Sequence, residues 1–132
     1  MITLENIFFQ YPDSNFKLKI DQLTFNTGSK TAIIGTSGYG KTTMLNLIAG
    51  ILLPETGKVI VQDSIINTKT DKHRRDYRIK NIGFIFQDFK LIPSLTAHDN
   101  ILMGIYPRRD IPAAEKENRI NELASRVGLT AK

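Results

Sequence analysis

The hydrophobic pattern at the start of the chain predicts a pair of strands. Apolar and polar residues alternate loosely over residues 1–11, strictly over residues 16–20, and the extended pattern resumes at residues 23–25. Between them lies Pro12-Asp13-Ser14-Asn15, a run of residues that favour turns. Alternation with a period of two indicates a half-buried strand. We therefore expect two neighbouring extended segments that pair with each other.

Three further stretches have the composition of strands. Residues 31–34 and 82–86 are apolar runs without polar alternation, which is typical of strands covered on both faces. Residues 58–61 follow a turn at residues 54–57 and predict another extended segment. Residues 63–76 are polar and show no clear period, so we expect a loop there with room for a short helical turn.

Two helices are predicted from their ends. Residues 43–49 are suited to a helix that Gly50 would end. Thr96 with Asp99 three positions later resembles a capping box, with Asp in place of the usual Glu or Gln. It predicts a helix over residues 97–105.

A last helix is predicted after Pro112, which is suited to the first helical position. Its apolar face has residues at helical spacing, namely Ile120, Leu123, Ala124 and Val127. Gly128 would close this helix. Earlier in the chain, Gly28 would supply a positive φ in the turn at residues 26–30. Strands and helices that alternate in this way predict the α/β fold class.

Composition narrows the possibilities without naming a function. The 132 residues form at most one domain, and the absence of cysteine excludes disulfides, thiolate catalysis and cysteine metal sites, which fits a reducing cytoplasm. No apolar run is long enough to span a membrane, and no signal pattern opens the chain. The net charge is +5, and its densest basic stretch is residues 69–80. Acidic residues interrupt that stretch, so we expect a solvated connecting segment rather than a nucleic-acid patch.

Residues 35–42, Gly-Thr-Ser-Gly-Tyr-Gly-Lys-Thr, satisfy every fixed position of the phosphate-binding pattern G-x-x-x-x-G-K-S/T. Glycines let successive backbone N–H groups turn toward an anion, and the helix that follows adds its unpaired donors and the positive end of its dipole. The sequence therefore predicts a site for a nucleoside triphosphate. The alternative is a strand–turn–helix joint whose glycines serve only a tight turn.

The residue types in this motif predict separate roles. Lys41 should reach the β- and γ-phosphates, Thr42 should offer its hydroxyl to Mg²⁺, and Thr43 is placed to contact the α-phosphate. The candidate ATP-binding residues of the loop are Gly35, Thr36, Ser37, Gly38, Tyr39, Gly40, Lys41, Thr42 and Thr43. The two histidines, His73 and His98, are expected to face solvent or cap helices rather than to act as ligands or bases.

Taken together, these stretches resemble the first part of an ABC-transporter ATPase, a P-loop NTPase. The resemblance covers essentially all 132 residues, and the Q-loop sequence is most similar to that of the branch of lipoprotein-release and macrolide-export ATPases. The motifs that carry it are Gly35-x-Ser37-Gly38-x-Gly40-Lys41-Thr42-Thr43, Leu53-x-x-x-x-Gly57-Lys58-Val59, Ile82-Gly83-Phe84-Ile85-Phe86-Gln87, and Leu91-Ile92-Pro93-Ser94-Leu95-Thr96 with Asn100-Ile101.

The resemblance implies an architecture and two further site residues. It implies a nucleotide-binding core with N-terminal antiparallel strands over residues 1–86, then the Q-loop and the start of a helical subdomain over residues 87–132. Tyr11 occupies the position of the aromatic residue that stacks on adenine in this family. Gln87 occupies the position of the glutamine that contacts Mg²⁺ or the attacking water. The implied catalytic residues are thus Gln87 and Lys41, with Thr42 and Gln87 at the metal.

The resemblance also implies partners and a location. ATP would lie between two such domains, and hydrolysis would drive a transmembrane transporter subunit. The domain would be cytoplasmic and peripheral on the inner face of the cell membrane, with no nucleic acid as partner. The transported substrate and the direction of transport do not follow from the sequence.

The sequence departs from the family pattern in two ways. Tyr39 replaces a small residue of the loop, so its side chain must point away from the phosphates if binding is to survive. The Leu-Ser-Gly-Gly-Gln signature, the Walker B Asp with its catalytic Glu, and the switch His do not occur in these 132 residues. We therefore expect a truncated domain that does not hydrolyse ATP at a useful rate alone.

Three alternatives stay open on the sequence. One is a non-hydrolysing nucleotide-binding regulatory module, or an inactive truncated fragment. A second is a P-loop kinase for a small molecule, for which no acceptor motif is visible. The third is a basic nucleic-acid binder that uses Arg74, Arg75 and Arg78.

Overall fold

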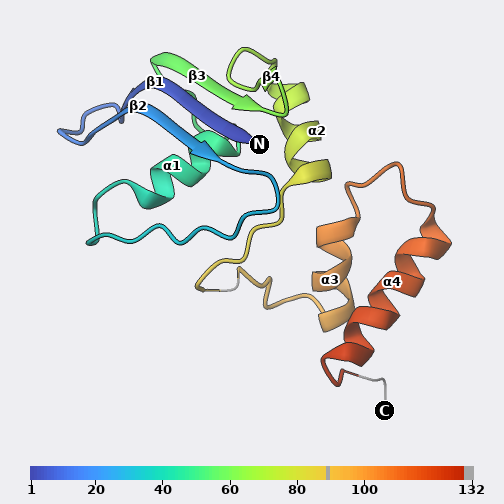
Figure 1. The fold of residues 1–132 in the computed structure, drawn as a ribbon. Coiled ribbons are helices and arrows are strands. Elements are labelled where there is room, and N and C mark those ends of the chain that lie inside the picture. Colours follow the sequence, from blue (N-terminus) through green and yellow to red (C-terminus); the bar gives the residue numbers. More distant parts are fainter. Residues whose placement is uncertain (89, 130–132) are drawn as a thin grey trace. The chain divides into compact units, whose positions relative to one another are not determined.

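The computed structural model describes residues 1–88 and 90–129, which divide between two compact units, Met1–Ile82 and Gly83–Lys132 (Figure 1). The first unit contains a four-stranded sheet in the order β2-β1-β3-β4 and two helices. Its elements are β1 (Ile2–Gln10), β2 (Lys17–Phe25), α1 (Lys41–Ile48), β3 (Thr56–Val61), β4 (Ser64–Ile65) and α2 (Asp71–Asn81). The second unit contains α3 (Ala97–Ile105) and α4 (Ala113–Arg126).

β1, at the stretch where the alternation predicts a strand, is an inner strand of the sheet. It pairs antiparallel with β2 from Ile2 opposite Phe25 to Gln10 opposite Lys17, which confirms the predicted strand pair. On its other side it pairs antiparallel with β3, with an irregularity between Glu5 and Phe8. β3 confirms the extended segment predicted at residues 58–61.

The core lies between this sheet and α1, which crosses one face of the sheet in Figure 1. Leu4 and Ile7 of β1, Val59 of β3 and Leu47 of α1 are each at most 1% exposed and belong to one cluster. Full burial of such a side chain contributes about 1.5–3 kcal/mol relative to an exposed one. The predicted first helix is confirmed, and Gly50 follows its end with a φ of 63°.

The two apolar runs at residues 31–34 and 82–86 are not strands, so both predictions are wrong. One isoleucine of each run lies in solvent, with Ile34 92% exposed and Ile85 98% exposed. A strand of this kind needs neighbours on both sides for its backbone N–H and C=O groups. Within residues 1–88 and 90–129 the four strands pair only with one another. The two apolar runs therefore have no partner strand among the described residues and do not join a sheet.

The polar segment at residues 63–76 is more regular than expected. It contains β4 and the first turn of α2, so the prediction of a loop there is wrong. The side chain of Thr70 caps α2 by accepting from the His73 amide. Arg74 and Arg78 then donate to the carbonyl oxygen of Gly50 at 3.2 and 3.0 Å, which ties α2 to the end of α1. These polar contacts, together with the Tyr77 side chain that packs against the core cluster, position this helix.

The second unit is a pair of helices with short polar contacts. The Thr96 side chain accepts from the Asp99 amide at 3.1 Å and donates to its carboxylate at 2.7 Å, which confirms the predicted capping arrangement. α4 begins one residue later than predicted, because Pro112 is its cap residue rather than its first helical residue. Ile120 is buried, whereas Val127 is 68% exposed and does not share its environment.

The glycines that close these segments have the conformation the sequence predicts. Gly28 and Gly128 both have a φ of 75°, a region that L side chains rarely occupy. None of the helices in the described part of the chain has both the length and the apolar character that a membrane crossing requires.

Candidate nucleotide-binding site

The loop before α1 depends on two glycines with left-handed backbone conformations. Gly38 and Gly40 both have a φ of 85°, and Gly40 is the cap residue of α1. A Cβ at Gly40 would lie 2.8 Å from the Phe16 ring and 3.2 Å from the Leu18 side chain. Gly40 is therefore required both by its φ and by the close approach of the loop to β2.

The unpaired backbone N–H groups at the N-terminus of α1 have no side-chain acceptor among the described residues. No side chain caps this helix, and no acidic residue lies in its first turn. The Met44 amide makes the first helical bond, to the Gly40 carbonyl at 2.8 Å. The amides before it point out of the helix at its positive end, where an anion is stabilised. The first turn of α1 is thus arranged to bind an anion.

Lys41 places a positive charge across the loop. Its ammonium donates to the carbonyl oxygens of Gly35 and Thr36, each at 2.7 Å. The side chain therefore folds back over the residues that precede α1 rather than extending away from them. Backbone donors and an ammonium group gathered in one exposed loop suit a polyphosphate.

The two threonines after Lys41 have different environments. Thr42 is exposed at the start of α1, and its hydroxyl oxygen is a donor atom of the kind that Mg²⁺ prefers. The Thr42 hydroxyl is therefore chemically suited to hold the Mg²⁺ of a magnesium–nucleotide complex. Thr43 is only 6% exposed, and its hydroxyl lies 3.1 Å from the hydroxyl of Tyr11.

Tyr11 is the first residue after β1, and the structure brings it to the helix that follows the loop. Its ring packs edge-on against Phe9 at 4.8 Å between centroids and lies tilted to Phe16 at 5.9 Å. Its hydroxyl is held by Thr43, as described above. The structure thus brings together Tyr11, the loop and α1 from stretches far apart in the sequence.

Sequence reasoning missed the residues that support this arrangement. Phe16 contacts both the loop, at Gly40, and the Tyr11 ring, whereas the alternating pattern predicts only a strand position for it. The bond between Tyr11 and Thr43 joins residues 32 positions apart. No local pattern contains such a signal, because it depends on how β1 and α1 meet in three dimensions.

Two further predicted site residues are exposed. The side chain of Tyr39 is 77% exposed. Gln87 belongs to the second unit, where it is exposed in a turn after the irregular residues 82–86. The strand that was expected to end at Gln87 does not form, and its role stays a prediction.

Comparisons with known proteins agree with this geometry. The sequence profile of the family described as "ABC transporter" matches residues 18–132. The chain is 35% identical over 112 residues to the ABC transporter ATP-binding protein YtrE of Bacillus subtilis, which covers 85% of the chain and 48% of YtrE. It is 36% identical over 107 residues to the lipoprotein-releasing system ATP-binding protein LolD of Psychrobacter arcticus, which covers 81% of the chain and 47% of LolD.

Solved structures give the same result. The dimeric ATP-binding cassette MJ0796, in a post-hydrolysis state bound to ADP and Pi, superposes with a TM-score of 0.81 at 32% identity. The match covers 95% of this chain and 56% of that one. The chain thus spans about half the length of the curated relatives above. The α/β fold expected from the sequence and the similarity to lipoprotein-release ATPases are both confirmed.

Proposed function

We propose that this chain, which belongs to the ABC transporter family, binds MgATP on residues 35–43 as part of an ATPase that drives transport across a membrane. The observation that carries the proposal is the loop geometry. Left-handed glycines, an uncapped helix N-terminus and the Lys41 ammonium meet in one place. Each of these features favours a polyphosphate, and no acidic residue in the first turn of α1 opposes it.

Lys41 is assigned the neutralisation of phosphate charge. Charged hydrogen bonds contribute about 1.5–3 kcal/mol each, so their loss is expected to weaken binding about tenfold or more. The test compares MgATP binding to Lys41→Ala and to Lys19→Ala by calorimetry. Lys19 is an exposed lysine on β2, and its replacement removes the same charge away from the loop. Equal affinity in the Lys41 variant and the unaltered chain would refute this site.

Tyr11 is assigned the adenine base. The aromatic contacts and the Thr43 bond hold its ring beside α1, where one end of a nucleotide on the loop would lie. Tyr11→Ala is expected to cost about 1–3 kcal/mol of binding energy, the range for a base stacked on an aromatic ring. Tyr11→Phe keeps the ring and removes only the hydroxyl, so it should retain most of the affinity.

The two Tyr11 variants give separate readings. Equal loss in both would assign the effect to the Thr43 bond, and no loss in either would show that Tyr11 does not contact the base. Since stacking accepts every base, ATP and GTP should compete within a modest factor.

Mg²⁺ would be held by Thr42, with Gln87 as the second residue assigned to it. The ion neutralises charge on the β- and γ-phosphates when it is bound. Thr42→Ala should therefore weaken MgATP more than it weakens ATP measured in the presence of a chelator. An equal effect on both forms would remove Thr42 from the metal.

We further propose two partners, a second ATP-binding domain and a transmembrane transporter subunit. The domain would lie on the inner face of the cell membrane. MJ0796 is dimeric in a state bound to ADP and Pi, and LolD is the ATP-binding protein of a lipoprotein-releasing system. These 132 residues contain no Walker B carboxylates or signature, so the chain by itself should bind ATP without steady turnover. Phosphate release that depends on Lys41 in purified chain would contradict this.

A further inference from the structure

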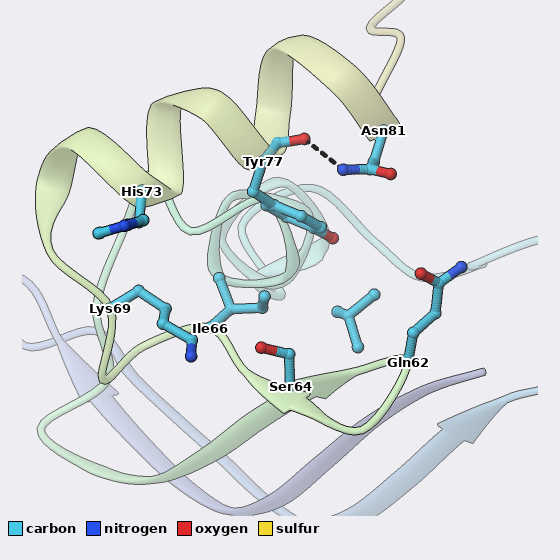
Figure 2. A pocket seen from close by; sticks show the side chains of 8 residues that line it. Gln62, Ser64, Ile66, Lys69, His73, Tyr77 and Asn81 are labelled. Carbon is cyan, nitrogen blue, oxygen red and sulfur yellow. Dashed lines mark hydrogen bonds between the residues drawn. The ribbon is translucent and has the colours of Figure 1, made fainter.

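A second candidate site lies in the first unit, between the β3–β4 hairpin and α2. It is a pocket of about 350 Å³, a size at the lower end for small-molecule sites. Eight residues line it, namely Val61, Gln62, Ser64, Ile66, Lys69, His73, Tyr77 and Asn81. Figure 2 shows these side chains arranged around one space beneath α2. None of the phosphate-loop residues belongs to this set.

Two polar groups of the pocket, the Ser64 hydroxyl and the Lys69 ammonium, are not bound to other described residues. In Figure 2 the Ser64 hydroxyl and the Lys69 ammonium extend toward each other along one wall. Within residues 1–88 and 90–129 no carboxylate lines the pocket, and Lys69 has no ion-pair partner. The nearby carboxylate of Asp71 instead pairs with Arg74 at 3.3 Å and Arg75 at 3.0 Å. Lys69 is therefore available to a ligand.

The other polar residues are partly fixed by the protein. His73 uses Nδ1 at 2.7 Å from the Thr70 hydroxyl, and the Asn81 amide donates to the Tyr77 carbonyl oxygen at 2.9 Å. Burial raises the pKa of Tyr77, so its phenol stays a neutral hydroxyl that can donate. The pocket thus presents the Lys69 ammonium, the Ser64 and Tyr77 hydroxyls and the Gln62 amide to a ligand.

Apolar surface forms the rest of the pocket. Val61 and Ile66 are buried members of the core, and the Tyr77 ring packs against the same core cluster. A purely inorganic anion would leave this surface in contact with water. A ligand with a small apolar body would cover it while its charged end reached Lys69 and Ser64.

We propose that this pocket binds a small organic carboxylate with an apolar body, such as an aromatic acid. Its carboxylate lies at Lys69 and Ser64, and its body lies on Val61, Ile66 and the Tyr77 ring. Residues 69–80 contain six basic and two acidic residues, so the local potential attracts an anion. The inference is independent of ATP binding, because the ligand carries no phosphate and the pocket shares no residue with the loop.

The test is a chemical-shift titration of the ¹⁵N-labelled 132-residue chain with benzoate, with benzamide as the neutral ligand of the same shape. Benzoate should give saturable shifts at the amides of Gln62, Ser64 and Asn81, with a dissociation constant on the order of millimolar for so small a ligand. Benzamide should bind about tenfold more weakly or not at all, because it lacks the charge that Lys69 recognises.

Two variants and one control locate the binding. Lys69→Gln should weaken benzoate about tenfold, and Tyr77→Phe should weaken it by a smaller factor while keeping the ring. Lys72→Gln removes the same charge from an exposed position on α2 outside the pocket and should leave binding unchanged. Equal binding of benzoate and benzamide, shifts confined to residues 35–42, or the same loss in the Lys69 and Lys72 variants would each overturn the proposal.

Discussion

Each of the two units of the chain is stabilised internally by a different kind of contact. Of the ten apolar side chains that are buried among the described residues, nine lie in Met1–Ile82, and Ile120 alone lies in Gly83–Lys132. The first unit has a sheet whose inner strand pairs on both sides. The second has one side-chain-capped helix, α3, and exposed ion pairs, each of which contributes little. We infer that the first unit unfolds cooperatively, whereas the second opens at low free energy.

The difference shows that apolar composition alone does not decide which segments are buried. Ile7 is 1% exposed in a strand with two neighbours, and Ile85 is 98% exposed in a run that is just as apolar. Ile7 pairs with Ile20 of β2, in a strand that also pairs with β3, and it packs in the core cluster with α1, while the described residues provide no strand for Ile85. Burial here follows the availability of backbone partners.

The largest expected effect comes from replacing the same residue type in both environments. Ile7→Ala should lower the free energy of unfolding by about 2–5 kcal/mol, because it removes buried methyl groups and leaves a cavity. Ile85→Ala should change it by less than about 0.5 kcal/mol. Urea denaturation followed by circular dichroism measures both. A similar loss in the two variants would show that residues 82–86 are packed in solution.

A smaller contrast is expected from two glycines. Gly57 has a φ of 92°, and a Cβ there would collide with the carbonyl oxygens of Glu5 and Asn6 in the irregular part of β1. Gly57→Ala should therefore cost about 1–3 kcal/mol, the range for a strained backbone.

Gly83 is the matched control, since it has open space around it and no positive φ. Gly83→Ala should be neutral or stabilise by up to about 1 kcal/mol, through the unfolded chain. The same denaturation experiment applies. If Gly57→Ala proved harmless, the close approach of β3 to β1 would be wrong.

The smallest effect concerns pH and the second unit. His98 of α3 lies 3.0 Å from the Glu117 carboxylate of α4, and its bonds to Glu117 and then Asp99 raise its pKa above the ordinary 6.5. A raised pKa in the folded state means that protonated His98 stabilises the helix pair. This contribution is complete below the ordinary value and is lost as pH rises through the raised one.

Hydrogen exchange of α3 and α4 amides, corrected for intrinsic rates, should therefore show more protection near about pH 6 than near about pH 8. His98→Gln cannot titrate and should remove the difference. Exchange in β1 should not follow pH in this way, because its contacts with β2 and β3 are backbone ladders. Identical profiles in the variant and the unaltered chain would exclude the pair as the cause.

Local signals in the sequence predicted part of the fold well. The alternation of residues 16–20 and the capping residues Thr96 and Asp99 act within a few positions, so β2 and α3 could be predicted. The phosphate-loop pattern is equally local, and two of its glycines, Gly38 and Gly40, have left-handed conformations. The assignments of Tyr11 and Gln87 instead came from resemblance, and they remain predictions.

The failures lie where distant contacts decide. α2 has few apolar residues, and it is held by Arg74 and Arg78 at the Gly50 carbonyl, more than twenty positions away in sequence. Its start at Thr70 and Asp71 was a readable cap signal that the polar composition obscured. For residues 31–34 the error was the reverse, since a strong local pattern lacked a partner strand among the described residues.

Because Lys41 already donates to two loop carbonyls, binding of a nucleotide at the proposed site would be an exchange of hydrogen-bond partners. The carbonyl oxygens of Gly35 and Thr36 each lose the Lys41 ammonium donor, now 2.7 Å away, when the lysine side chain turns to another acceptor. An incoming molecule that offers two oxygens replaces both partners, whereas one that offers a single oxygen leaves a donor unmatched. At the proposed site, a phosphate group, which has several oxygens, would therefore be favoured over a ligand with a single acceptor oxygen.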